Sequence, residues 1–337
     1  MILVTGGTGM VGAHLLYKLL NEEQNIRAIY RNKKKFEIVK RIFSYYNDNT
    51  EALFNKIEWI LADLNDIPSL NDAFKDVTHV YHCAAFVSFE PDKFYLLKKT
   101  NIEGTANIVN LCLANKTQKL CYVSSIAAIG SSKNNEPITE ETDWNPEKDN
   151  SVYAITKYGA EMEVWRGTQE GLNAVIVNPG IILGPGIWKY GSGGLFTRIY
   201  KGLPFYTKGV TGYVSVNDVV NAMIGIMQSH IINERFILVS ENLSFETFTK
   251  QTAIALGVKQ PKKEAKQWHL NLFWRFDWLR HKLVGKRRQM SKHNAQSATT
   301  KDYYNNDKII KALGFKFMVI AKSIENVASY FLEDQKN

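Results

Sequence analysis

Tyr153 and Lys157 stand four residues apart in the segment Tyr-Ala-Ile-Thr-Lys, a spacing that places both side chains on one face of a helix. A free tyrosine has a pKa of about 10 and is a poor acid or base near neutral pH. A neighbouring ammonium group favours the phenolate, so we expect Lys157 to lower the pKa of Tyr153. The hydroxyl could then exchange a proton with a substrate oxygen. Such pairs also occur on solvated helix faces, but this one follows an apolar run that ends in Val123-Ser124-Ser125.

A glycine-rich turn near the N-terminus could hold phosphate groups. It reads Thr-Gly-Gly-Thr-Gly-Met-Val-Gly over residues 5–12, follows an apolar run and opens a helical pattern. Glycines here permit a tight turn, let the backbone approach a pyrophosphate and let helix and strand pack closely. The start of the helix adds N–H groups and partial positive charge. The sequence therefore predicts a dinucleotide site. Its expected residues are Gly6, Thr8, Gly9, Met10, Val11 and Gly12.

The elements that must position these groups alternate between short apolar runs and helical patterns. We expect strands at residues 1–5, 26–30, 57–61, 79–82, 120–124 and 174–178, with helices such as 11–20 and 102–113 between them. This alternation predicts a parallel sheet covered on both faces, and continuous apolar runs are typical of strands buried on both faces. The expected fold is α/β, with a doubly wound parallel sheet of the Rossmann type over residues 1–180.

Beyond residue 180 the rhythm changes. A glycine-rich loop at 184–194 precedes a helix, a strand near 213–216, a helix from Asn217 and a strand at 236–239, and helical segments follow. We expect residues 181–337 to form mainly a smaller substrate-binding lobe, with some segments returning to the Rossmann domain.

Composition excludes several classes of protein. The chain has 337 residues, of which 45% are hydrophobic and 22% charged, which excludes a mainly disordered or fibrous protein. Cys83, Cys112 and Cys121 are too few for a disulfide framework and have no metal-ligand spacing. No signal peptide or membrane-spanning run is evident, so we expect a cytoplasmic protein without a metal. The net charge of +9 is concentrated in residues 259–311, which hold 14 lysines and arginines against four acids.

The glycine spacing, Gly-x-x-Gly-x-x-Gly, resembles that of the short-chain dehydrogenase/reductase superfamily, and of its extended branch (the NAD-dependent epimerase/dehydratase family) in particular. Four further patterns carry the resemblance, which covers residues 1–250 well and the rest loosely. They are Asp63-Leu64, His82-Cys83-Ala84-Ala85, Asn101-Ile102-Glu103-Gly104-Thr105 and Tyr153 to Lys157. The resemblance implies an NAD(P)-dependent enzyme in which Tyr153 transfers the proton and Lys157 binds the nicotinamide ribose. Ser125, five residues before Gly130, would hold the substrate oxygen, whereas Ser124 is favoured as structural.

The resemblance also implies further cofactor contacts. Asp63 would accept a hydrogen bond from the adenine amino group, and Leu64, Ala84 and Ala85 would line the adenine and ribose side. Asn101 would lie near the cofactor and help to position Lys157. Val123, Pro179, Gly180 and Ile182 complete the expected cofactor site. We interpret His82 and Cys83 as packing residues, and Asp218 as a structural residue that caps a helix.

The second expected strand indicates which nicotinamide cofactor is used. An enzyme specific for NAD usually has an acid at its end, which accepts from the ribose 2′-hydroxyl. Here Tyr30 takes that position, Arg31 and three lysines follow, and no acid appears before Glu37. Arginine binds a 2′-phosphate well, whereas an acid would repel it. NADP(H) is therefore favoured, and NAD(H) stays open.

The segment from Asn178 to Gly186 bears on the substrate. Sugar-nucleotide epimerases and dehydratases of the extended branch typically read Arg-x-x-Asn-x-Tyr-Gly-Pro here, but this chain has Asn178, Ile181 and Leu183 at the three polar positions. The Asn-Pro pair resembles dihydroflavonol reductase and cinnamoyl-CoA reductase relatives instead. We expect reduction of an apolar ketone or aldehyde, or oxidation of the alcohol. One alternative is a nucleotide-sugar epimerase or dehydratase, with Arg198 or Lys208 as the phosphate anchor. Another is an NADP-sensing binding protein without catalysis.

The aromatic and basic segment 262–292 leaves three interpretations open. It could pack on the core with a solvated basic face, cover a large apolar substrate as a lid, or lie at a membrane interface. Apolar residues run almost all round the expected helix, which favours packing on the core. We therefore expect a small-molecule substrate, no nucleic acid and no membrane contact. A homodimer through residues 102–115 and 153–167 is considered.

Overall fold

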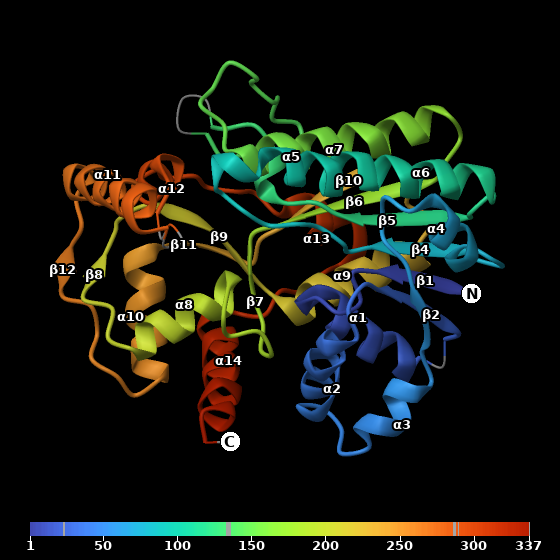
Figure 1. The fold of residues 1–337 in the computed structure, drawn as a ribbon, viewed down its shortest axis with the longest axis horizontal. Helices are drawn as coiled ribbons and strands as arrows, with labels where there is room; N and C mark the ends of the chain where they lie inside the picture. Colours follow the sequence, from blue (N-terminus) through green and yellow to red (C-terminus); the bar gives the residue numbers. More distant parts are fainter. Residues whose placement is uncertain (23, 133–135, 286–287, 289, 337) are drawn as a thin grey trace.

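A seven-stranded parallel sheet forms the centre of the molecule in the computed structural model, which describes residues 1–22, 24–132, 136–285, 288 and 290–336. Its strand order is β10-β6-β5-β4-β1-β2-β3, so the chain moves outward in both directions from β1 (Figure 1). The strands are β1 (Ile2–Thr5), β2 (Ile26–Tyr30), β3 (Glu58–Leu61), β4 (His79–His82), β5 (Lys119–Val123), β6 (Ala174–Pro179) and β10 (Glu234–Leu238). The expected doubly wound Rossmann sheet is confirmed, with each expected strand in place to within two residues.

Helices cover both faces of this sheet, because successive strand residues point to opposite sides. Leu3 packs into the core on one face and Val4 into the core on the other, and Leu120 and Cys121 divide in the same way. One core lies beneath α1 (Met10–Asn21), α2 (Phe36–Ser44), α3 (Thr50–Asn55) and α9 (Val216–Gln228). The other lies beneath α4 (Ile67–Ala73), α6 (Gly104–Ala114) and α7 (Val152–Gln169). The carboxyl ends of the strands therefore meet at one edge between two packed layers.

A smaller lobe occupies the other end of the molecule (Figure 1). Its three-stranded sheet has the order β11-β9-β7, and a strand pair joins β12 to β8. The strands are β7 (Ile181–Leu183), β8 (Phe205–Tyr206), β9 (Val210–Ser215), β11 (Glu241–Ser244) and β12 (Lys263–Glu264). A separate core, with Phe196, Tyr213, Phe248 and Phe331 at its centre, holds this sheet to α8 (Gly191–Tyr200), α10 (Phe245–Ala255) and α14 (Ile320–Asp334). Meanwhile β10, α9 and α13 (Asp307–Leu313) lie with the large sheet.

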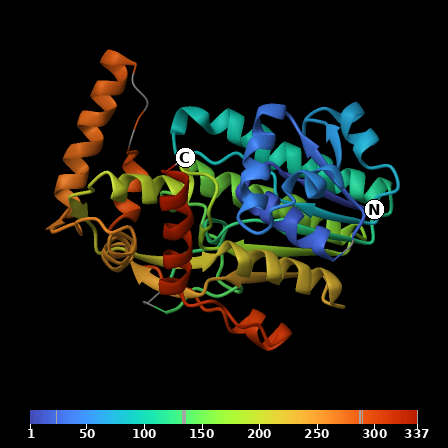
Figure 2. The same cartoon turned by 90° about the horizontal axis from the view of Figure 1, so that it is seen from below.

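The aromatic and basic segment forms α11 (Gln267–Val284), which contacts α12 (Lys292–Ser297) at the outer corner of the lobe. Burial of this helix in the core was the favoured expectation, and it is wrong. Only Leu270 and Asp277 of α11 are buried, and the helix projects away from the body (orange in Figure 2). Lys286 and Arg287 of the basic run lie outside the described residues. Among the described residues, no helix is long and apolar enough to cross a membrane.

Candidate active site

The glycine turn packs directly against the segment that follows β4. Gly6 has a φ of +69°, and a Cβ atom there would lie 2.6 Å from the backbone nitrogen of Ala84. At Gly12 a Cβ atom would lie 2.2 Å from the carbonyl oxygen of Gly6. Since α1 begins at Met10, directly after this turn, its first residues face the same edge of the sheet. The turn is thus a cradle that side chains would fill, which fits the backbone approach that a pyrophosphate needs.

His82 ends β4 and is buried between two threonines. Its ring nitrogens are hydrogen-bonded to Thr5 Oγ1 at 2.6 Å and to Thr105 Oγ1 at 3.0 Å. Burial, together with the nearby Lys157 charge, lowers the pKa of His82 to about 3. Burial also raises the pKa of the Cys83 thiol to about 12. His82 is therefore neutral and bound to two hydroxyl groups, and the Cys83 thiol keeps its proton. Both states support the interpretation of these side chains as packing residues.

Tyr153 lies in the first turn of α7, whose N-cap is Ser151. Burial raises the pKa of Tyr153 to about 12, although a hydrogen bond from the Ser125 side chain lowers it. The structure therefore brings Ser125, which follows β5 closely, to the hydroxyl of Tyr153. The ring of Phe89 packs edge-on against Tyr153, with centroids 5.3 Å apart. Phe89 was not among the expected site residues, since it lies in an irregular loop with no motif to mark it.

Lys157 is one turn further along α7, on the same face and 2% exposed. Its Nζ donates to the carbonyl oxygen of Val123 at 2.7 Å and to the hydroxyl of Tyr122 at 3.0 Å. Burial lowers the pKa of Lys157 to about 8, against the negative charge of Glu161, which raises it. The expected lowering of the pKa of Tyr153 by Lys157 is not found, because the ammonium bonds to β5 and the effect of burial on the tyrosine prevails.

Glu161 continues the same face of α7 and was missed from the sequence. It is fully buried, and its Oε1 accepts a 2.5 Å hydrogen bond from Asn178 Nδ2. Arg235 lies 3.5 Å from its other oxygen. Burial raises the pKa of Glu161, while hydrogen bonds from Ser124 and Asn178 lower it. Glu161 lies four residues after Lys157, and this interval was the signal in the sequence that could have placed it on the same helix face. Its partners Asn178 and Arg235 could not be found in this way, because they come from distant strands.

Asn101 ties the loop after β4 to α7. It sits in a π-helical turn over residues 98–103, where its side chain exchanges hydrogen bonds with both backbone groups of Phe86. Its Nδ2 also donates to Thr156 Oγ1 at 3.3 Å. Asn101 thus contacts Thr156, the residue before Lys157, and ties the loop that carries Phe89 to α7. Its expected part in positioning Lys157 stays a prediction.

Arg31 and Asp63, both expected to contact the cofactor, lie next to each other at the ends of β2 and β3. Arg31 Nη1 is 3.2 Å from Asp63 Oδ2, and both side chains are exposed, 59% and 40% respectively. Burial raises the pKa of Asp63, but hydrogen bonds from Asn65 and Arg31 outweigh it and lower the pKa overall. Both residues thus follow the carboxyl ends of their strands, at the edge of the sheet where the glycine turn lies, and the lowered pKa keeps Asp63 ionised near neutral pH.

The other expected cofactor residues lie at this edge or beside it. Leu64 follows β3 and packs against Gly104, Val123 ends β5, and Pro179 ends β6. The backbone of Gly180 donates to Leu238, and Ile182 lies in β7. The glycine turn and the segment after β4 meet at Gly6 and hold the remaining expected residues, which are Thr8, Gly9, Met10, Val11 and Ala85.

Asp218 is structural, as expected, but it does not cap α9. The N-cap is Ser215, whose hydroxyl accepts from the backbone of Asn217. Asp218 lies in the first turn and accepts a 2.9 Å hydrogen bond from the backbone of Met318. It therefore joins α9 to the segment that leads into α14.

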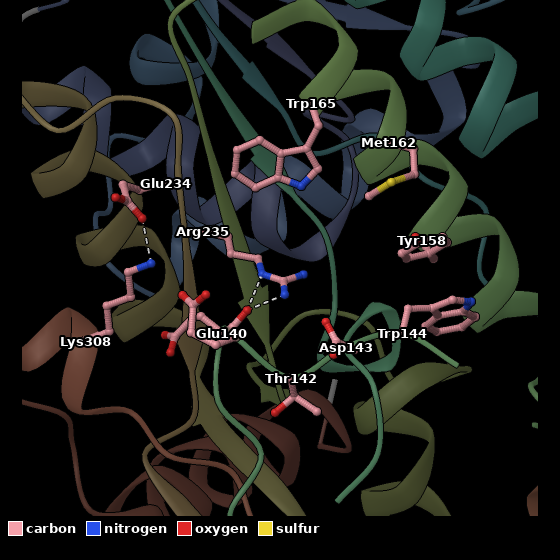
Figure 3. A pocket seen from close by; sticks show the side chains of 11 residues that line it. Glu140, Thr142, Asp143, Trp144, Tyr158, Met162, Trp165, Glu234, Arg235 and Lys308 are labelled. Atoms are coloured by element: carbon pink, nitrogen blue, oxygen red, sulfur yellow. Dashed lines mark hydrogen bonds and ion pairs between the residues drawn. The ribbon is translucent and has the colours of Figure 1, made fainter. Parts of the chain in front are cut away.

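A cavity of about 330 Å³ lies away from these residues, on the outer side of α7. Its wall combines stacked Trp144 and Tyr158 with Glu140, Arg235 and Lys308 (Figure 3). Arg235 donates to the backbone oxygen of Glu140, and Lys308 pairs with Glu234 at 2.6 Å. None of the expected site residues lines it, so this cavity is separate from the candidate active site.

Comparison with known proteins gives a consistent relationship. A model of the NAD dependent epimerase/dehydratase family matches residues 2–237. A protein of Synechocystis sp. named "Putative dihydroflavonol 4-reductase" is 27% identical, over 97% of this chain and 93% of its own length. The UDP-glucose 4-epimerase of Vibrio cholerae is 26% identical, over 77% of this chain and 76% of its own. The crystal structure of gox2253 superposes with a TM-score of 0.81 at 25% identity, covering 99% and 98% of the two chains.

Proposed function

Because the chain belongs to the NAD dependent epimerase/dehydratase family, whose members include NAD(P)-dependent reductases and epimerases, we propose that it is an NADPH-dependent reductase of apolar ketones or aldehydes. The family membership makes it an enzyme that binds a nicotinamide cofactor. The preference for NADPH and the nature of the substrate are the proposed steps, and each depends on particular residues.

The observation that carries the substrate class is the state of Asn178. Its side chain is buried and donates both to Glu161 and to the carbonyl oxygen of Ser125, so it has no donor left for a substrate. Ile181 and Leu183, at the other two positions, offer only apolar side chains, and Leu183 is buried in the lobe. The sugar diphosphate that epimerases of this family hold would find no polar ligand at these three positions.

Apolar side chains also flank the proton-transfer group. Phe89 contacts Tyr153 while its own side chain is 39% exposed, and Val87 in the same loop is 57% exposed. Exposed apolar groups beside a reacting hydroxyl favour a substrate that buries them. An aromatic or aliphatic carbonyl compound fits this requirement better than a charged one.

The chain's own residues then have distinct roles. The cradle at Gly6 and Gly12 fits the pyrophosphate, and the bound cofactor supplies the hydride. Tyr153 keeps its proton near neutral pH, since its pKa is about 12, and can donate it to the carbonyl oxygen as negative charge develops there. Ser125 donates to the same oxygen and holds it near Tyr153. Lys157 supplies positive charge beneath the site.

The test is oxidation of NADPH, followed by absorbance, with a panel of apolar aldehydes and ketones and with NADH in parallel. We expect consumption with NADPH and a fall in kcat of about 10²–10⁴ for Tyr153→Phe, with the Kd for NADPH unchanged. Equal rates in the parent and in Tyr153→Phe would contradict the catalytic role of Tyr153.

Similarity to a UDP-glucose 4-epimerase keeps a second reaction open. There the hydride would return to the same sugar, so a nucleotide sugar would be converted without net oxidation of the cofactor. Of the two anchors considered, Lys208 is paired with Glu264 at 2.9 Å, whereas Arg198 is exposed on α8. Conversion of UDP-glucose without turnover of NADPH would replace the reductase proposal. Tight binding of NADP(H) with no reaction of either kind would favour a sensor.

A further inference from the structure

The solvent-facing side of α11 carries a continuous apolar stripe. Trp268, Leu272, Phe276, Leu279 and Leu283 recur at intervals of four, four, three and four residues, which aligns them on one helix face. Their exposed fractions run from 44% to 73%. Scattered exposed apolar residues are ordinary, but a row of five large ones along one helix face indicates a binding surface.

The opposite face of α11 is the one that holds the helix to the lobe. Leu270 is buried against Ala265 and Ala295, with Trp274 partly buried beside them. Asp277, seven residues after Leu270, is buried and accepts from the backbone of Met290. The helix is therefore anchored through Leu270, Trp274 and Asp277, and its apolar stripe points away from the protein.

Positive charge borders the stripe. Arg275 and Lys282 lie two turns apart on one edge, and each sits over the ring of a neighbouring tryptophan, at 4.9 Å and 5.3 Å. The single acid of α11, Asp277, is buried and paired with Arg280. Tryptophan and leucine on one face with lysine and arginine at its border are typical of helices that lie in the interface of an anionic membrane.

A second copy of the chain fits this surface less well. Two stripes packed together would bring Arg275 and Lys282 of each helix close to those of the other, with no exposed acid on α11 to pair with them. Anionic lipid headgroups supply the charge that the helix lacks. We propose that α11 is a membrane-docking helix, which binds through its apolar stripe to a bilayer surface that contains anionic lipid. This proposal departs from the expectation of no membrane contact, which rested on packing of the helix on the core.

The test is co-sedimentation of the full chain with vesicles of phosphatidylcholine alone and of phosphatidylcholine with about 30% phosphatidylserine. We expect binding to the anionic vesicles, weakened by raising the salt from about 0.05 M to about 0.5 M. Leu272→Ser with Phe276→Ser should reduce the partition coefficient more than tenfold. Arg275→Gln with Lys282→Gln should reduce it about thirtyfold at low salt, since each basic side chain near an anionic surface contributes about fivefold.

Matched controls make the result specific to α11. Ile254→Ser removes an apolar side chain that is 64% exposed on α10. Lys18→Gln with Lys56→Gln removes the same charge from exposed positions elsewhere. Both controls should bind vesicles as the parent does, and all variants should keep the parent's thermal unfolding and NADPH binding.

Two outcomes would overturn the proposal. The first is that the parent does not bind anionic vesicles at low salt, or that both α11 variants bind them as the parent does. The second is that the parent self-associates in light scattering, and that Leu272→Ser with Phe276→Ser abolishes this self-association but leaves vesicle binding unchanged. That second result would identify another copy of the chain as the occupant of the stripe. Neither measurement requires a substrate, so failure of the reductase proposal leaves this test intact.

Discussion

If the proposed preference for NADPH depends on Arg31, Arg31→Ala should remove it and leave binding of NADH nearly unchanged. Arg31 is the first basic residue after β2, where the adenosine ribose of the cofactor is expected. Its side chain is 59% exposed, so a 2′-phosphate on that ribose could reach it from solvent. The lysines at 33–35 follow in a short turn and are all exposed. The variant therefore tests whether the positive charge at this edge of the sheet reads the 2′-phosphate.

The expected magnitude follows from the ion pair that Arg31 makes with Asp63. This pair is exposed on both sides, so its contribution is at most about 1 kcal/mol. A hydrogen bond from a charged donor to phosphate contributes about 1.5–3 kcal/mol. At the upper end of this range, moving Arg31 from Asp63 to the 2′-phosphate gains about 2 kcal/mol, because the lost ion pair is subtracted from the new phosphate contact. Loss of Arg31 should weaken NADPH about thirtyfold.

The assay is fluorescence titration of NADPH and NADH, and the readout is the ratio of their Kd values. Asp63→Asn is an independent test, because it removes the carboxylate that pairs with Arg31 and so leaves Arg31 available to the 2′-phosphate. It should raise the ratio that favours NADPH about two- to fivefold. Any effect of Asp63 on the adenine is common to both cofactors and cancels in the ratio. Arg41→Ala, which removes an exposed arginine from α2, should leave the ratio unchanged.

Two results would refute this reasoning. A parent enzyme that binds NADH at least as tightly as NADPH would show that the missing acid at Tyr30 does not set the preference. An unchanged ratio of Kd values in Arg31→Ala would show that Arg31 pairs with Asp63 and does not contact the 2′-phosphate. Higher salt should reduce the NADPH preference of the parent, since the contact is exposed.

Three further perturbations have defined outcomes. Phe89→Ala should raise the KM for aromatic carbonyls about two- to tenfold through loss of one aromatic contact, with the Kd for NADPH unchanged; an equal effect on a small aldehyde would contradict this. His82 has a folded pKa of about 3, below its unfolded value, so its contribution to stability is present above pH 6.5 and is lost as the pH falls towards 3. Between pH 7 and pH 5 the parent should therefore lose about 2 kcal/mol more unfolding free energy than His82→Gln, measured by urea unfolding, with exposed His230→Gln as the control. Gly6→Ala should abolish NADPH binding, because its Cβ would meet backbone at 2.6 Å; tight binding by a folded variant would refute the cradle.

The central sheet could be predicted from the sequence because strands buried on both faces need apolar residues at most positions, rather than at alternate ones. In β1, Leu3 and Val4 serve opposite cores, so the run is continuous and easy to recognise. The placement of Tyr153 and Lys157 on one face of α7 was equally accessible, since a four-residue interval fixes a shared helix face. Local patterns determine both features.

Other features depend on contacts between distant segments. The strand β11 has the sequence Glu-Asn-Leu-Ser, whose polar composition gives no strand signal, and it forms because it pairs with β9 at the edge of a small sheet. Glu161 acquires its role from Asn178 and Arg235, which approach from β6 and β10. For α11, apolar residues in most directions suggested burial, but the lobe covers only the face of Leu270 and Trp274. The composition of a helix does not state how much surface its neighbours can cover.

The protonation of Tyr153 bears on the direction of the reaction. Oxidation of an alcohol needs the phenolate as base, whereas reduction of a carbonyl needs the phenol as acid. Burial raises the pKa of Tyr153 to about 12, and the ammonium of Lys157 is held by Val123 and Tyr122, so the hydroxyl keeps its proton across the physiological range. Burial of Lys157 lowers its own pKa to about 8, which weakens its ability to stabilise a phenolate at higher pH. Both shifts act in the same sense, and they support the proposed reaction, in which Tyr153 donates its proton to a carbonyl oxygen.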